Sequence, residues 1–284
     1  MPNFPIVDTH VHLTDKQRIS YSWMSEVPAI DRSYGLDDYD AARGPVDVAA
    51  FVFMEVGCDA GDHLTEVQWI TELAASEPRL QGIVAHAPLQ QGADVGAELE
   101  SLARNPLVKG IRRLLQIEDL DFCLQPSFLE GLRLLPQYEL TFDICISHQH
   151  LANVLKMVET CPEVRFVLDH IGKPGIKDQL FEPWKTEIRT LANFPNVSCK
   201  ISGLPTEADL QDWTPDDLRP YIDHIIDCFS FDRVLFGSDW FVATLASTYS
   251  RWVETLDWAL AGCSDAELRQ LYVDNARTFY RLGS

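Results

Sequence analysis

The sequence lacks several features that would each indicate a particular class of protein. No run of about 18 apolar residues occurs, so no transmembrane helix is expected. The segment from Met1 to Asp8 lacks the basic and apolar regions of a secretory signal peptide, and we therefore expect a cytoplasmic protein. The seven cysteines include no C-x-x-C pair, and their odd number favours reduced thiols over disulfides or a zinc–thiolate site.

Positive charge is scarce as well. The 284 residues include 23 lysines and arginines against 43 aspartates and glutamates, which gives a formal net charge of −20. A polyanion repels nucleic acid and anionic membrane surfaces, so neither is expected as a partner. Low-complexity tracts and linkers rich in glycine or serine are also missing from the sequence. We therefore expect one barrel domain over residues 1–284, and the sequence indicates no oligomeric state.

What the sequence does contain is a repeated alternation of short apolar strands and amphipathic helices. Most of the strands are apolar on both faces, as in a parallel sheet that helices cover. The expected strands are Pro5–His12, Val48–Gly57, Leu80–Leu89, Lys109–Gln116, Thr141–His148, Arg165–Gly172, Val197–Gly203 and Arg233–Trp240. The expected helices are Leu64–Ser76, His150–Thr160, Leu218–Cys228, Tyr249–Leu260 and Asp265–Tyr280.

This alternation predicts an α/β fold, a single (β/α)₈ barrel of the TIM type. A doubly wound sheet is the alternative, but it needs a Gly-rich phosphate turn after an early strand, and none is present. In a barrel, catalytic side chains lie where the carboxyl ends of the strands meet. The long aromatic connection over residues 14–47 is expected to lie above that opening.

Polar residues concentrate at these predicted strand ends. His10 and His12 are two residues apart on the first strand, so they share a face and could bind one metal ion or one water. His148, His170 and Asp239 lie at the ends of the fifth, sixth and eighth strands. One such histidine alone could be a core residue, whereas the convergence of all of them favours a catalytic site. The remaining histidines are expected to be structural: 63, 86, 150 and 224.

This constellation resembles the amidohydrolase superfamily and, within it, the sugar-lactonase branch. The segments that carry the resemblance are IVDTHVHL (6–13), KGIRRLLQ (109–116), RFVLDHIGKP (165–174), NVSCKISGLPTEAD (196–209) and RVLFGSDWFV (233–242). The resemblance implies an amidohydrolase-like barrel and a hydrolase of sugar catabolism that opens the ester ring of a neutral aldonolactone such as L-fucono-1,5-lactone. A dicarboxylate lactonase, a metal-dependent decarboxylase and a lactone isomerase are the alternatives on the same scaffold.

Lactone chemistry requires a base for water and a donor for the carbonyl oxygen. We expect Asp239 to be the base, and His170 and Arg112 to be its catalytic partners. The substrate-binding residues are expected to be Trp23 and Trp240, which could stack on a sugar ring, together with Glu55, Gln116, His148 and Lys173.

One divalent ion, zinc or manganese, is expected on His10, His12 and Asp239, with Glu55 as a further candidate ligand. Lys109 lies at the beginning of the fourth strand, at the wrong end of the barrel to bridge two ions. The lactonase branch also includes members with weak or absent metal dependence, so the resemblance leaves a dispensable ion open. No organic cofactor is expected.

Overall fold

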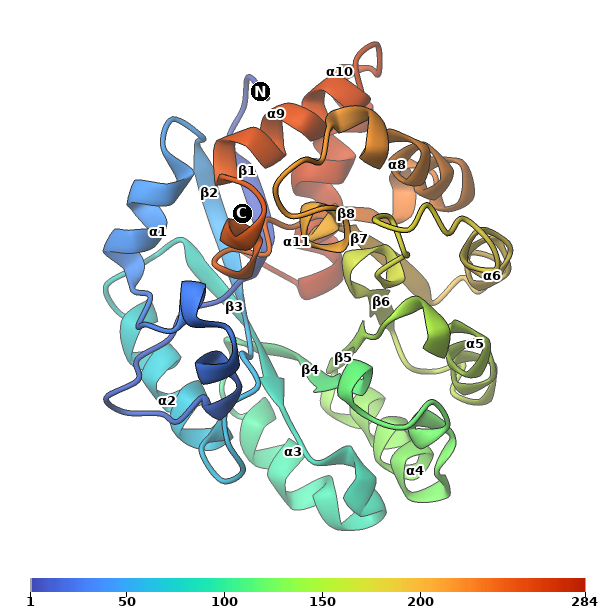
Figure 1. Ribbon diagram of the computed structural model, residues 1–284. Coiled ribbons are helices and arrows are strands. Elements are labelled where there is room, and N and C mark those ends of the chain that lie inside the picture. The colour runs from blue at the N-terminus through green and yellow to red at the C-terminus, as the bar shows by residue number, and fades with distance from the viewer. Residues whose placement is uncertain (1, 284) are drawn as a thin grey trace.

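The computed structural model describes residues 2–283, so Met1 and Ser284, at the ends of the predicted 1–284 domain, lie outside the described residues. Eight parallel strands follow one another in sequence order and form the inner ring of Figure 1. They are β1 (Ile6–Val11), β2 (Val48–Met54), β3 (Leu80–His86), β4 (Val108–Leu114), β5 (Thr141–Cys145), β6 (Phe166–Leu168), β7 (Val197–Ile201) and β8 (Val234–Phe236). The predicted (β/α)₈ barrel is confirmed.

Helices surround this ring, and the predicted ones are all present (Figure 1). They are α1 (Leu36–Arg43), α2 (His63–Ala74), α3 (Gly96–Ala103), α4 (Pro126–Leu134), α5 (Leu151–Thr160), α6 (Trp184–Leu191), α7 (Leu204–Glu207), α8 (Pro215–Phe229), α9 (Tyr249–Ala259), α10 (Asp265–Arg269) and α11 (Asn275–Tyr280). The predicted helix over residues 265–280 is divided, because a π-helical turn over Gln270–Asp274 separates α10 from α11. Within residues 2–283, no helix has the length and apolar character needed to span a bilayer. All seven cysteines are free thiols, as predicted.

The ring closes between β8 and β1 through the chain that follows β8. Val11 and Trp240 form a parallel bridge, and the N–H of His12 donates to the carbonyl oxygen of Trp240 at 2.6 Å. The N–H of Asp239 donates to the carbonyl oxygen of His10 at 3.0 Å. These backbone bonds bring Asp239 beside the two histidines of the first strand.

The floor of the barrel is an apolar cluster completed by α11. Small and branched side chains from the strands fill the interior, where Val52, Val84 and Leu235 are fully buried. Phe279 and Tyr280 of α11 pack into the same cluster. Apolar side chains therefore fill this part of the barrel, as in other packed barrels of this type.

Candidate active site

The predicted catalytic residues meet in one cavity at the C-terminal ends of the strands. Its volume is about 350 Å³, within the range of small-molecule sites. Among the predicted site residues, the cavity is lined by His12, Trp23, Glu55, Arg112, Gln116, His170, Lys173 and Asp239.

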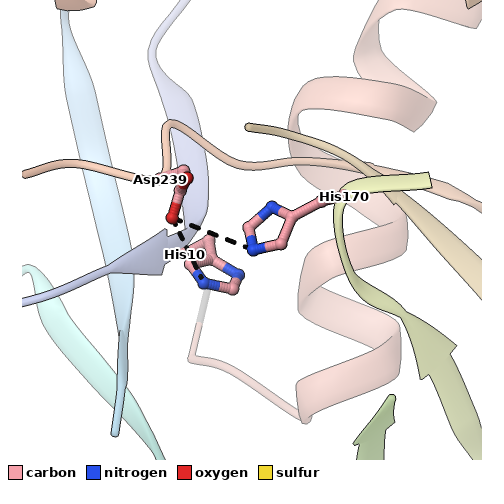
Figure 2. Close-up of side chains that lie close together, drawn as sticks. All are labelled: His10, His170 and Asp239. Carbon is pink, nitrogen blue, oxygen red and sulfur yellow. Dashed lines mark ion pairs between the residues drawn. The ribbon is translucent and has the colours of Figure 1, made fainter. Parts of the chain in front are cut away.

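Asp239 lies at the centre of the site. Its Oδ1 atom is 3.4 Å from Nε2 of His12, 3.7 Å from Nε2 of His10 and 3.8 Å from Nε2 of His170. His10 and His12 share a face, as predicted, with ring centroids 4.9 Å apart. Figure 2 shows the rings of His10 and His170 directed at the Asp239 carboxylate. All four side chains are buried, so their interactions are little screened by water.

The backbone turns sharply at two of these residues. His170 and Asp239 have φ angles of 52° and 58°, in a region that residues with side chains seldom adopt. These turns follow directly on strands that end at Leu168 and Phe236, so the predicted strands over 165–172 and 233–240 were too long. Gly203 leaves room for both side chains, since a Cβ there would lie 2.6 Å from Nδ1 of His170 and 3.0 Å from Oδ2 of Asp239. Strained backbone of this kind is typical of functional sites.

Hydrogen-bond partners orient the rings of His10 and His12 beside Asp239. Nδ1 of His12 lies 2.9 Å from the carbonyl oxygen of Met54, which only accepts, so Nδ1 carries a proton and donates to it. The guanidinium of Arg112, which only donates, lies 3.2 Å from Nε2 of His10. Nε2 of His10 thus lies between the Arg112 guanidinium and the Asp239 carboxylate, and Nε2 of His12 lies beside the same carboxylate.

Comparison with known proteins agrees with this geometry. The family model described as amidohydrolase matches residues 7–282 of the chain. The chain belongs to the amidohydrolase family. A similar protein, the L-fucono-1,5-lactonase of Burkholderia ambifaria, is 30% identical over 285 residues, which cover 97% of this chain and 95% of that relative. The resemblance predicted from the sequence is confirmed, and the protein is a hydrolase.

Solved structures similar to this amidohydrolase share its fold over nearly the whole chain. An amidohydrolase from Burkholderia multivorans with bound zinc is 26% identical with a TM-score of 0.89, and the match covers 99% of this chain and 100% of that one. A putative 2-pyrone-4,6-dicarboxylic acid hydrolase from Pseudomonas putida is 19% identical with a TM-score of 0.76, and the match covers 98% and 97% of the two chains. The second similarity shows the fold alone.

The site of the amidohydrolase pairs neutral imidazoles with an ionised carboxylate. Burial lowers the pKa of His170 to about 4 and lowers the pKa of His10 well below its ordinary value. Burial on its own would raise the pKa of Asp239, but the interactions with His170, His12 and His10 outweigh it, so the pKa lies below the usual range. Asp239 is therefore charged at neutral pH, while His10 and His170 are available as donors or ligands.

The donors of this site fit one divalent ion. His10, His170 and Asp239 place two imidazole nitrogens and a carboxylate oxygen within 4.8 Å of one another. Donor atoms around a tetrahedral zinc ion lie about 3.3 Å apart, close to the 3.7 and 3.8 Å that separate Asp239 from the two histidines. The ligands predicted from the sequence were His10, His12 and Asp239. The structure places His170 with His10 and Asp239, and His12 lies beside them. An ion held here takes the place of the hydrogen bond between Arg112 and His10.

Arg112 is held in position by Glu55. Its Nε donates to Oε1 of Glu55 at 2.7 Å, and a terminal nitrogen donates to the backbone oxygen of the same residue. Oε2 of Glu55 accepts the N–H of Gly57 at 2.7 Å. Burial disfavours the charge of Arg112, but Glu55 outweighs it and raises the pKa of Arg112. Glu55 therefore positions Arg112, and because it also lines the cavity, its predicted role in substrate binding stays a prediction.

A buried lysine that the sequence analysis did not single out lies within the barrel. Lys200, on β7, is fully buried, and its Nζ donates to Oδ2 of Asp143 at 2.6 Å. The same Nζ lies 3.0 Å from Oδ1 of Asp169 and 3.5 Å from Nδ1 of His10. Tyr280 donates to Asp143 at 2.6 Å. The available signal was a lysine between apolar residues near the end of the strand VSCKI, since a buried charge requires partners.

Two residues predicted to contact substrate lie away from the cavity. Trp240 is only 2% exposed, packs edge-on against Tyr34 and does not line the cavity. It is therefore not available to stack on a sugar ring. His148 begins a 3₁₀ turn, and its Nδ1 lies 3.1 Å from the carbonyl oxygen of Lys173.

The cavity is also lined by residues to which the sequence analysis assigned no role in binding, and three of them lie on strands next to the site. His86 ends β3, Arg113 lies on β4, and Cys145 ends β5. Cys145 is a thiol rather than a thiolate, because burial raises its pKa to about 11. Its Sγ lies 3.5 Å from the side-chain oxygen of Gln116.

Proposed function

We propose that this amidohydrolase opens the ester ring of a neutral sugar lactone, such as L-fucono-1,5-lactone, with water that Asp239 deprotonates. Two similar proteins are L-fucono-1,5-lactonases, from Burkholderia ambifaria and Burkholderia multivorans, with 30% and 29% identity over nearly the whole chain. The cavity has the size and the polar groups for one monosaccharide-sized ligand.

The charge pairing in the cavity supports a neutral substrate. Arg112, Arg113 and Lys173 are the lysines and arginines of the described cavity lining. Arg112 pairs with Glu55 at 2.7 Å, Arg113 pairs with Glu118, and Lys173 lies 3.9 Å from Glu207. A dicarboxylate substrate requires several cations that are free to bind carboxylates. Each cation here already faces a carboxylate of the protein, which favours a neutral lactone over a dicarboxylate.

Asp239 activates the attacking water in this proposal. The ionised carboxylate accepts a proton from water as the oxygen attacks the lactone carbonyl carbon. The bond from this carbon to the ring oxygen then breaks, and the proton returns to the ring oxygen, which leaves as a hydroxyl. A carboxylate with a low pKa is a weak base, so the reaction also depends on groups that stabilise the charge on the carbonyl oxygen.

Arg112 and His170 stabilise that developing charge. Arg112 is fixed by Glu55 and charged, and its guanidinium lies beside His10, within the cavity lining. His170 is oriented by Ser202, whose hydroxyl lies 2.9 Å from Nδ1. Preorganised donors of this kind each contribute on the order of a hundredfold or more to acyl transfer. A divalent ion on His10, His170 and Asp239 supplies Lewis-acid polarisation of the carbonyl when it is bound.

The proposal is tested by a pH-indicator assay over aldono-1,4- and 1,5-lactones, with and without a chelator. We expect turnover of a neutral aldonolactone and little turnover of a 2-pyrone dicarboxylate. Activity that survives the chelator assigns carbonyl stabilisation to Arg112 and the histidines, whereas loss that zinc or manganese restores assigns it to a bound ion. If no lactone is turned over, the proposal is wrong, and the decarboxylase and isomerase alternatives are then assayed with ring-intact acids.

A further inference from the structure

His86 is a polar residue of the cavity that the reaction described above does not use. It ends β3, where it pairs in register with Arg112 of β4. In the eight-stranded ring, β3 lies across from β7, the neighbour of β8, and Asp239 follows β8. His86 therefore lines the side of the cavity that faces Asp239.

The ring of His86 is oriented by protein contacts, but its nitrogens are not satisfied by them. It packs edge-on against the ring of His63, with centroids 5.3 Å apart and an interplanar angle of 74°. His63 is itself fixed by Glu98, with 3.0 Å between Nε2 and Oε1. Within residues 2–283, the ring nitrogens of His86 form no hydrogen bond to the protein, so they are free to bind a ligand in the cavity.

The environment of His86 keeps its ring neutral. Burial lowers its pKa to about 4; the neighbouring Glu55 opposes this shift, whereas Arg113, His63 and Arg112 contribute to it. A neutral imidazole offers one N–H donor and one lone pair. A hydroxyl group can both accept and donate, so it can bond to whichever of the two nitrogens it meets, whereas a carboxylate can only accept.

We propose that His86 is a specificity-determining residue that hydrogen-bonds a ring hydroxyl of the substrate remote from the ester carbonyl. This inference rests on the proposed lactonase function and defines its substrate class further. The reacting carbonyl lies beside Asp239, and the polyhydroxylated part of the ring extends across the cavity to β3. A lactone without ring hydroxyls binds without this contact.

The test compares two substrates in wild type and His86→Phe: a hydroxylated aldono-1,5-lactone and δ-valerolactone, which has no ring hydroxyls. We expect kcat/KM for the aldonolactone to fall about 10- to 100-fold, the range for loss of a buried hydrogen bond to a substrate hydroxyl. The value for δ-valerolactone should change less than about threefold. His86→Asn, which retains a donor and an acceptor, should restore part of the preference for the hydroxylated substrate.

The matched control is His224→Phe, which makes the same substitution on α8. His224 packs against Trp184 and does not line the cavity. It should leave the preference between the two lactones unchanged. Equal losses on both lactones in His86→Phe would mean that His86 is only structural and would overturn the inference. If wild type hydrolyses neither lactone, the proposed function has failed. Binding of L-fucose, measured by calorimetry, then tests whether His86 recognises a hydroxyl. A Kd weakened at least tenfold in His86→Phe supports hydroxyl recognition, and an unchanged Kd refutes it.

Discussion

Nζ of Lys200 and Oδ1 of Asp169 lie 3.0 Å apart at a point where neither side chain is exposed to solvent. The same ammonium group donates to Asp143, so one cation compensates two buried carboxylates. Asp169 also lies 3.5 Å from Nδ1 of His10. The orientation of the His10 imidazole is thus connected to a charge network within the barrel, and the network extends to Tyr280 of α11.

Lys200→Met should strongly destabilise the protein, because it leaves Asp143 and Asp169 buried without their cation. Removal of one partner of a buried ion pair costs about 3–5 kcal/mol, measured as the free energy of unfolding in urea. Tyr280→Phe removes one neutral donor from the same network and should cost about 1 kcal/mol. If the free energy of unfolding falls by the same small amount in both variants, the lysine is not required to stabilise the two carboxylates.

Asp239→Asn should reduce kcat at least about a thousandfold, because the amide cannot accept the proton of water. The fold should persist, since the exchange keeps the shape of the side chain. Circular dichroism and the urea midpoint check the fold, and a lactone assay checks the rate. The control is Asp212→Asn, an exposed position between α7 and α8. Near-wild-type turnover by Asp239→Asn would show that the base is another group.

Arg112 and Glu55 should behave as one unit in a double-mutant cycle. Glu55→Gln removes the charge that orients Arg112, and Arg112→Met removes the donor itself, so each alone should lower kcat/KM by about a hundredfold. The double variant should be little worse than Arg112→Met, because Glu55 acts through Arg112. Independent, multiplicative losses would instead indicate that Glu55 contacts the substrate directly.

The preference for hydroxylated lactones should persist to unusually low pH. The pKa of His86 is lowered to about 4, so the neutral ring predominates down to about pH 5, whereas an ordinary histidine titrates near pH 6.5. A histidine whose pKa is lowered by folding disfavours the folded state as pH falls from about 6.5 towards 4. The ratio of kcat/KM for the two lactones, measured from pH 8 to 4.5, checks this. A midpoint near pH 6.5 contradicts it.

The sequence predicted the barrel because eight apolar strands alternate with amphipathic helices. Both patterns can be recognised within short segments of the chain. It also predicted that His10, His12, His170 and Asp239 converge, because strand ends meet at one rim of a barrel. It could not predict the position of Trp240, which depends on the positive φ of Asp239. The partners of Lys200 come from strands distant in the sequence, and no local pattern joins them.

The pairing of every cavity cation with a carboxylate of the protein has a consequence for the end of the reaction. Hydrolysis of a neutral lactone yields a hydroxy acid that ionises at neutral pH, so the ligand acquires a negative charge close to Asp239. Arg113 and Lys173 are already matched by Glu118 and Glu207 and offer this new charge little compensation, and Arg112 shares its charge with Glu55. Under the proposed function, the pocket that admits the neutral substrate would be electrostatically less favourable to the charged product, and this change would promote product release.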